Sequence, residues 1–394
     1  MSTEIEGIVA SLRSLERADD VNQAYATVDR WNRESRTADL LELAGAIERA
    51  CDVAGAAKLP YEAVADHVEE VLALTPGADH VDALFSLLTM PRVRSVQRPR
   101  PHEMRVRAFA SRLGHGQTKD ALVAAIARAG SKKEHTEILA CWMHETVLRG
   151  TALDRETAAV EFHARLAAQG HVLGQLPLAL LDAEGEAPTY MPMYGANAIS
   201  KAVARLESGP TSTRTIPPPG DHVAPKATRI EDAALEARLR EAVNPWTKSA
   251  GSNGKAEAKV FRLEPALGSA SPGRWLLRSL PLECLEGADT LRADRAGADA
   301  VWGALFAAAA NGGAYSSGLG AAYGRRAAWT SLAALVDSPA DATPKQVDDR
   351  AREASFLMFG APGGFWNDVA WDIGMLAVRP GGATVAILAA TDTD

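Results

Sequence analysis

The sequence predicts a mainly α protein, in which a helical repeat-like domain is followed by a smaller α+β domain. Three observations support this class. Apolar residues keep helical spacing through the first 170 residues, a proline-rich segment follows residue 207, and two short apolar segments near the end flank a Pro-Gly-Gly turn. The chain is therefore expected to hold an all-helical N-terminal domain and an α+β C-terminal domain.

The first domain, residues 1–207, reads as a succession of short amphipathic helices. Apolar residues recur at three- and four-residue intervals in each of four early segments, as in Ile5, Ile8, Val9, Leu12 and Leu15. Pro60 marks a helix start and Thr75-Pro76-Gly77 a helix end. Further helices are expected at 80–89, 103–113, 118–129, 133–149, 155–168 and 195–206. The pattern is typical of an α-solenoid of HEAT or armadillo type, and, because no fixed-period consensus is visible, an irregular bundle is the alternative.

Residues 208–228 are predicted to be a linker. The segment contains Pro217-Pro-Pro219, which cannot continue a helix and favours an extended chain. A second domain, residues 229–394, therefore follows.

The second domain is expected to combine helices with a small antiparallel sheet. Helices are predicted at 231–242, 272–285, 294–310, 321–336 and 344–358, and a strand near Val260. The segments 373–378 and 384–389 flank Arg379-Pro-Gly-Gly382, which predicts a β-hairpin. The hairpin and the strand near Val260 would form the sheet.

Composition excludes several classes of protein. The longest apolar run, 300–310, is shorter than the roughly 18 residues that a membrane span needs, and the N-terminus begins with Thr3 and Glu4 rather than a basic and then apolar signal. We therefore expect a cytoplasmic protein without a membrane partner. The three cysteines form no C-x-x-C pair, so we predict no metal and no cofactor.

Charge is strongly segregated along the chain. Residues 1–90 hold 17 acids and 7 bases, whereas residues 91–133 hold 11 bases and 2 acids. The cationic segment is either a docking face for an acidic partner or the charge complement of the acidic helices before it. Few aromatic residues lie among the arginines, so nucleic acid is not the expected partner. The candidate docking residues are Arg92, Arg94, Arg98, Arg100, Arg105 and Arg107.

The candidate binding site lies in the second domain, where glycines, hydroxyl groups, arginines and tryptophans are concentrated. Glycines between two helices let backbone amides approach a ligand, and arginines one turn into the next helix could bind an anion there. The alternative is a loop whose hydroxyls satisfy exposed backbone groups. The candidate residues are Asn311, Tyr315, Ser316, Ser317, Arg325, Arg326, Trp366, Asp368 and Asp372.

No named catalytic motif is intact at this candidate site. Ser316 lies in a sequence like a nucleophile elbow, but a helix rather than a strand precedes it, and no histidine follows His222. The loop also lacks the lysine and the spacing of a P-loop. Asp368 and Asp372 could act as paired acids, although a turn before a strand is the preferred interpretation.

The C-terminal third resembles an uncharacterised, mainly actinobacterial family of unknown function. The resemblance rests on Gly313-Ala-Tyr-Ser-Ser-Gly318, Tyr323-Gly-Arg325, Trp329, Trp366, Ala370-Trp-Asp372 and the ending Ala389-Ala-Thr-Asp-Thr-Asp394. Because that family has no known function, the resemblance implies no catalytic residue.

The leading hypothesis is a non-enzymatic interaction or scaffold protein of a bacterial cytoplasm, whose partner is another protein. An extended helical array without an intact catalytic motif favours it. By analogy, such a protein would suit toxin neutralisation or phage defence. The alternative is an enzyme that acts on a small or phosphorylated substrate in the second domain, with a small anion as ligand. The sequence does not indicate the oligomeric state.

Overall fold

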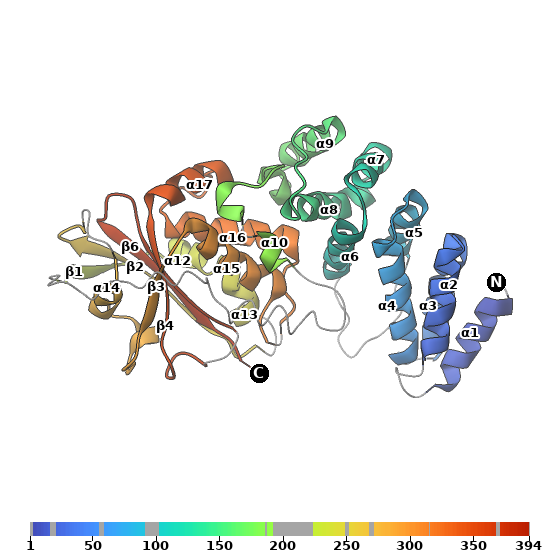
Figure 1. The fold of residues 1–394 in the computed structure, drawn as a ribbon, viewed down its shortest axis with the longest axis horizontal. Coiled ribbons are helices and arrows are strands. Elements are labelled where there is room, and N and C mark those ends of the chain that lie inside the picture. The colour runs from blue at the N-terminus through green and yellow to red at the C-terminus, as the bar shows by residue number, and fades with distance from the viewer. Residues whose placement is uncertain are drawn as a thin grey trace. The chain divides into compact units, whose positions relative to one another are not determined.

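The computed structural model describes residues 3–15, 21–54, 59–90, 102–185, 187–191, 224–248, 252–267, 272–314, 316–367 and 371–393. Contacts divide the chain into two compact units. Unit 1 comprises Met1–Thr146 and Arg155–Phe162, and unit 2 comprises Val147–Asp154 and His163–Asp394. The predicted class, mainly α with a smaller α+β part, is confirmed (Figure 1).

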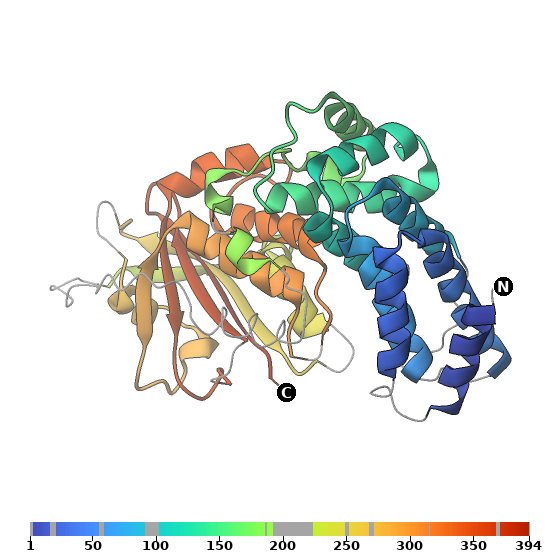
Figure 2. The ribbon, with the colours of Figure 1, turned by 45° about the vertical axis from the view of Figure 1, so that its right-hand side comes forward.

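Unit 1 begins with a series of antiparallel helices (Figures 1 and 2). They are α1 (Thr3–Ser14), α2 (Asn22–Arg33), α3 (Thr37–Ala54), α4 (Leu59–Leu74), α5 (Ala78–Thr89), α6 (His102–Gly116), α7 (Lys119–Ala129) and most of α8 (Thr136–Leu148), with a short 3-10 helix, η2 (Lys133–His135). The positions agree with the sequence prediction to within a few residues, because each buried stripe recurs with the helical period. In α2, for example, that stripe is Ala24, Val28 and Trp31.

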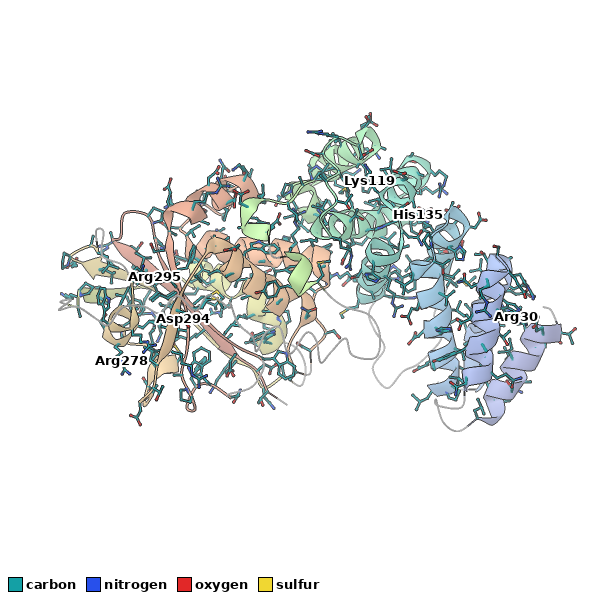
Figure 3. All side chains as sticks on the ribbon, viewed as in Figure 1. Arg30, Lys119, His135, Arg278, Asp294 and Arg295 are labelled. Carbon is teal, nitrogen blue, oxygen red and sulfur yellow. The ribbon has the colours of Figure 1, made fainter. Side chains whose placement is uncertain are left out.

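The helices of unit 1 pack against their neighbours in sequence. α1 contacts α3 and α4, α2 contacts α3 and α4, α3 contacts α5, and α4 contacts α6. Charged pairs at the surface add to this packing. Arg30 of α2 binds Glu4 of α1, and Lys119 at the start of α7 binds Glu156 at 2.6 Å; Arg30 and Lys119 are labelled in Figure 3.

Unit 2 contains the end of α8 and the second half of α9 (Thr157–Ala168). It also contains a chain segment that the sequence assigned to the first domain. Residues 147–154 and 163–191 belong to unit 2 by their contacts, and the Leu153 amide donates to the Leu178 carbonyl at 2.8 Å. The segment holds two 3-10 helices and a short α-helix, η3 (Val172–Gln175), η4 (Asp182–Glu184) and α10 (Ala187–Tyr190). The predicted helix at 195–206 and residues 208–223 of the predicted linker lie outside the described residues.

The centre of unit 2 is a six-stranded antiparallel sheet with the order β1-β2-β6-β5-β4-β3. Its strands are β1 (Lys226–Ile230), β2 (Lys255–Glu264), β3 (Arg292–Ala296), β4 (Ser355–Gly360), β5 (Asp372–Val378) and β6 (Thr384–Thr391). The predicted hairpin is confirmed, since Val378 pairs with Val385, and the predicted strand near Val260 pairs with β6.

Three strands lie where the sequence predicted a linker or a helix. β1 begins inside the predicted linker, β3 occupies the start of the helix expected at 294–310, and β4 occupies the end of the helix expected at 344–358. The run Phe356–Phe359 is apolar at each position, so its sequence fits a buried strand as well as a helix. Pairing of β4 with both β3 and β5 selects the strand.

Helices cover one face of the sheet, and a shorter segment covers the other (Figures 1 and 2). The first cover consists of α12 (Ala233–Leu239), η5 (Glu241–Val243), α13 (Asn244–Lys248), α15 (Ala298–Asn311) and α16 (Ala321–Leu335), with α17 (Pro344–Glu353) against α16. The second consists of α14 (Arg274–Ser279) and η6 (Glu283–Leu285), where the sequence predicted one helix at 272–285.

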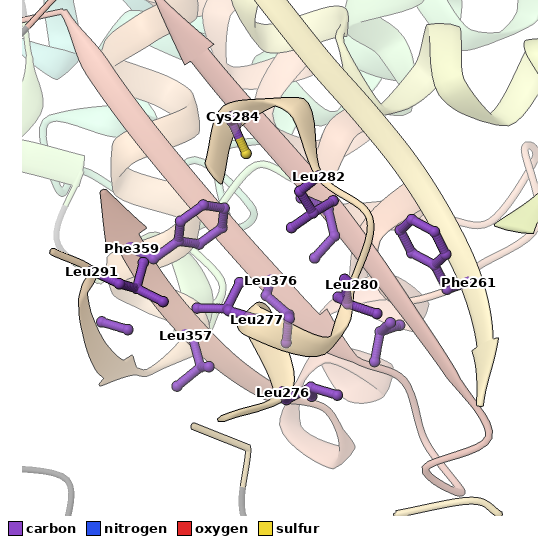
Figure 4. Close-up of a cluster of buried hydrophobic side chains, with 14 of the residues drawn as sticks. Phe261, Leu276, Leu277, Leu280, Leu282, Cys284, Leu291, Leu357, Phe359 and Leu376 are labelled. Carbon is purple, nitrogen blue, oxygen red and sulfur yellow. The ribbon is translucent and has the colours of Figure 1, made fainter. Parts of the chain in front are cut away.

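The second cover closes a hydrophobic core over the sheet (Figure 4). Leu276, Leu277 and Leu282 pack there against Phe261 of β2 and Leu376 of β5. Burying one such side chain contributes about 1.5–3 kcal/mol relative to leaving it exposed. Alternate residues of each strand face the two covers, so both faces of the central strands are buried.

Candidate functional site

The glycine-rich loop 311–320 joins α15 to α16. Gly312 and Gly320 have φ angles of 80° and 74°, a conformation that glycine adopts without the penalty of a Cβ. The Leu319 and Gly320 amides donate to the Ala309 and Ala310 carbonyls at 2.8 and 3.2 Å. The loop therefore folds back along the end of α15, and these amides cap its carbonyl groups rather than face a ligand.

A buried carboxylate, Asp392, holds the start of this loop. Asp392 is fully buried, and its Oδ2 accepts a hydrogen bond from the Ala314 amide at 2.9 Å. Its Oδ1 accepts one from Ser252 at 3.3 Å. The absence of a side chain at Gly313 leaves room for this carboxylate, because a Cβ there would overlap Asp392 Oδ2. The sequence prediction missed Asp392, although an acid directly after an apolar strand was a usable signal.

The hydroxyl groups of the loop have different environments. Ser316 Oγ accepts a hydrogen bond from the Gly313 amide at 2.8 Å, so this side chain stabilises the turn. Ser317 is exposed. Asn311 donates to the Tyr190 carbonyl at 3.3 Å, and Tyr315 lies outside the described residues. Ser316 therefore fits the alternative interpretation, in which hydroxyl groups of the loop bond to its own backbone.

Arg325 is fully buried and paired with Glu184 of η4. Its Nε and Nη2 donate to the two carboxylate oxygens at 2.7 and 2.8 Å. Arg325 also donates to the Pro177 carbonyl at 2.8 Å, and Trp329 Nε1 donates to Glu184 at 2.7 Å. Arg326, by contrast, is exposed at its end and lies 3.6 Å from Glu241. Arg325 therefore anchors a chain segment from inside the protein and does not line an open site.

Trp366 and Asp372 lie at the other face of the sheet. Trp366 is buried and donates from Nε1 to the Cys284 carbonyl at 2.8 Å. Asp372 accepts a hydrogen bond from Thr391 at 2.5 Å, and the Thr391 hydroxyl accepts one from Asn367 at 2.8 Å. Asp368 lies outside the described residues.

The described candidates do not converge on one pocket. Alternation along β5 and β6 directs Asp372 and Thr391 to the face that α14 covers, whereas α15 and α16, with Arg325, cover the opposite face. An enzyme built from these residues would need them within hydrogen-bond reach of a common substrate atom. Their distribution over two faces of the sheet does not provide that geometry.

Of the candidate docking residues, Arg105 is buried. It is 8% exposed, donates to Glu69 of α4 at 2.9 Å, and lies over the Phe109 ring at 5.0 Å. Arg105 therefore neutralises an acidic helix, which is the second of the two interpretations that the sequence left open for the cationic segment. Arg107 is half-buried. Arg92, Arg94, Arg98 and Arg100 lie outside the described residues.

The cysteines and potential metal ligands have environments typical of structural groups. Cys141 and Cys284 are free and buried, and burial raises the pKa of each thiol, with further contributions from Glu137 and Glu257 respectively. A nucleophilic cysteine needs the opposite shift. Within the described ranges, no three His, Cys, Asp or Glu side chains are grouped so that they could hold a metal ion. The same ranges contain no helix with the length and apolar character of a membrane span.

The comparison with known proteins matches nearly the whole chain to one family, and not only its C-terminal third. The model of a family of unknown function, DUF6183, matches residues 22–394. Curated proteins and solved structures give no match. The expectation of an uncharacterised family is confirmed, and the match includes unit 1 from α2 onward. The chain belongs to DUF6183, a family of unknown function.

Proposed function

We propose that the protein is a non-enzymatic binding protein of a bacterial cytoplasm, in which unit 1 is an α-solenoid-like platform for another protein. The observation that carries the proposal is the packing of α1–α5, in which each helix contacts the helix that follows it by two places in the chain. Arrays of this kind are extended along one direction and present long surfaces to a partner.

A polar network between helices supports a rigid platform. His80 Nε2 lies 2.8 Å from Asn32 Oδ1, and the Asn32 amide donates to Thr75 at 3.0 Å. Gln117 bridges the next turn, where it donates to the Thr75 carbonyl at 2.6 Å and accepts from the Gly77 amide at 3.1 Å. These contacts join α2, the turn before α5 and the end of α6, so the helices keep a fixed spacing.

The surface of α4 carries negative charge. α4 contains four acids and no lysine or arginine, and of the four only Glu69 is buried, where it pairs with Arg105. Burial raises the pKa of the Tyr25 phenol on α2, and the carboxylates of Asp66 and Glu70 raise it further, which is the effect of a negative local potential. We propose that this acidic face, defined by Tyr25, Asp29, Asp66 and Glu70, meets a basic partner, because complementary charge steers association.

The test is capture of a partner by the full chain from the native host. The wild-type protein should retain one protein in stoichiometric amount, and Asp66→Lys with Glu70→Lys should lose it while keeping the wild-type melting curve. Retention should also weaken with salt, since Asp66 is exposed and Glu70 is partly exposed.

A matched control reverses two charges in unit 2. Glu231 and Glu353 are exposed, so Glu231→Lys with Glu353→Lys changes net charge equally without touching the acidic face. Equal loss of the partner from both variants would contradict the acidic face as its binding surface. Recovery of a bound small molecule without a protein would favour the enzyme alternative. A role in toxin neutralisation or phage defence stays a prediction by analogy.

A further inference from the structure

Unit 2 contains a charged groove away from the glycine-rich loop. The groove has a volume of about 550 Å³ and is lined by β1, α12, β2, η6 and the loop before β5. This volume is within the range of small-molecule sites, about 300–1,000 Å³. Four basic side chains line it: Arg229, Arg240, Lys255 and Lys259.

Lys259 is the buried cation of this groove. The residue is 9% exposed, and its ammonium lies 2.7 Å from Glu257 and 2.9 Å from Glu283. An ammonium group has three N–H donors, so these two partners leave one donor for a further acceptor. Both carboxylates thus hold the ammonium at the groove lining, but they differ greatly in exposure.

Glu257 is a permanent partner of Lys259. Its side chain is 4% exposed, and it accepts hydrogen bonds from the amides of Cys284 and Glu283 at 2.7 and 3.0 Å. Burial acts to raise the pKa of Glu257, but the hydrogen bonds from Lys259 and the two amides outweigh it and lower the pKa. Glu257 therefore stays charged and fixed, and it positions Lys259.

Glu283 is an exchangeable partner. Its side chain is 68% exposed, and its contact with Lys259 is a single ion pair at the groove surface. Such a carboxylate can turn into solvent at little cost. Glu283 thus occupies the place on Lys259 that the carboxylate or phosphate group of a ligand would take.

The other charged side chains of the groove determine which ligand charge it favours. Glu236 pairs with Arg229 at 2.9 Å and lies 3.9 Å from Arg240, so the fixed acids of the groove are Glu236 and Glu257. The groove is lined by four basic and four acidic side chains, but Glu283 and Glu286 are exposed and can point into solvent. When Glu283 turns away, Lys259 keeps only Glu257 as its partner, and the basic groups of the groove can face the charge of a bound anion.

We propose that this groove binds a small dianion, an organic phosphate or a dicarboxylate, whose acidic group displaces Glu283 from Lys259. Lys255 is the second contact. Its ammonium lies over the Phe365 ring at 4.8 Å and donates to the Gly364 carbonyl at 3.5 Å, which leaves two N–H donors for a ligand. Arg240 is the third, because 3.9 Å from Glu236 is too long for a hydrogen bond.

The experiment is calorimetric titration of the full chain with inorganic phosphate and, separately, with succinate at low salt. Glu283→Gln removes the internal competitor and should bind about two- to fivefold more tightly than the wild type, the effect of one partly exposed ion pair. Lys255→Gln with Arg240→Gln should bind about tenfold more weakly. Preference for one of the two anions identifies the source class of the ligand.

The matched control is Glu286→Gln. Glu286 lines the same groove and has the same charge, but its carboxylate is not bonded to Lys259. Glu283→Gln should therefore exceed Glu286→Gln in affinity for either anion. Equal affinities would overturn the displacement of Glu283, and no heat of binding by folded Glu283→Gln with either anion at millimolar concentration would overturn the site itself.

Discussion

Arg325 and Glu184 form a fully buried ion pair although 141 positions separate them in the chain. The guanidinium binds both carboxylate oxygens, and it also donates to the Pro177 and Ala179 carbonyls at 2.8 and 3.2 Å. These partners lie in the segment before η4 or in η4 itself. One side chain of α16 thereby fixes the path of that segment within unit 2.

Removal of Arg325 should destabilise unit 2 strongly. Arg325→Met leaves the Glu184 carboxylate buried without its cation, and loss of one member of a buried pair costs about 3–5 kcal/mol. Chemical denaturation measures this. The control is Arg326→Met, because Arg326 is 38% exposed at its side chain and its loss should change the free energy of unfolding by about 0–1 kcal/mol. Similar effects of the two substitutions would contradict the anchoring role.

A side chain at Gly313 should disturb the junction between the glycine-rich loop and β6. In Gly313→Ala the new Cβ overlaps Asp392 Oδ2, which is fixed by the Ala314 amide, so we expect a loss of about 1–3 kcal/mol by overpacking. Gly360→Ala is the control, since nothing lies within 4 Å of a Cβ at that position. Thermal melts of both variants test the contact, and equal melting temperatures would refute it.

Deletion of residues 383–394 should abolish the cooperative unfolding of unit 2. β6 lies between β2 and β5, so its removal splits the sheet into two parts and exposes the apolar faces of both neighbours. The deletion also removes Asp392. Circular dichroism on heating measures the transition, and a melting curve unchanged from the full chain would show that this end is dispensable.

Stability should fall on acidification in part through His80. Burial lowers the pKa of His80 from its ordinary value of 6.5, although Asp79 acts in the opposite direction. The unfolded chain therefore takes up a proton before the folded chain does, and stability present above pH 6.5 is lost as the pH falls through the lower folded pKa. Urea unfolding at about pH 7.5 and about pH 5 should show a smaller loss for His80→Gln than for the wild type. An equal loss would exclude His80 as a source of the dependence.

The local features of this fold could be read from the sequence. The buried stripe Ala24, Val28 and Trp31 marks α2 because helix periodicity is written in neighbouring residues. Thr343 and Gln346 form the cap of α17, and Pro-Gly-Gly382 forms the hairpin turn. Each of these signals involves residues a few positions apart, so no knowledge of the distant chain is needed.

The candidate site could be predicted only in its composition. The sequence identified Ser316, Arg325 and Asp372 as unusual, but it could not show that Arg325 would be buried against Glu184 or that Asp372 would bond to Thr391 on the opposite face of the sheet. Burial and pairing depend on which distant segments contact each other, and a single sequence does not show those contacts.

The sequence by itself determined the order of the helices, the closing hairpin and the segregation of charge, because these follow from short-range periodicity, turn residues and composition. Only the tertiary structure decided that β4 is a strand, that Arg105 pairs with Glu69, and that Lys259 lines a groove between a buried and an exposed carboxylate. The physical reason is that strand pairing and buried charge are satisfied by partners far apart in the chain, whose identity is set by the packing of the whole unit.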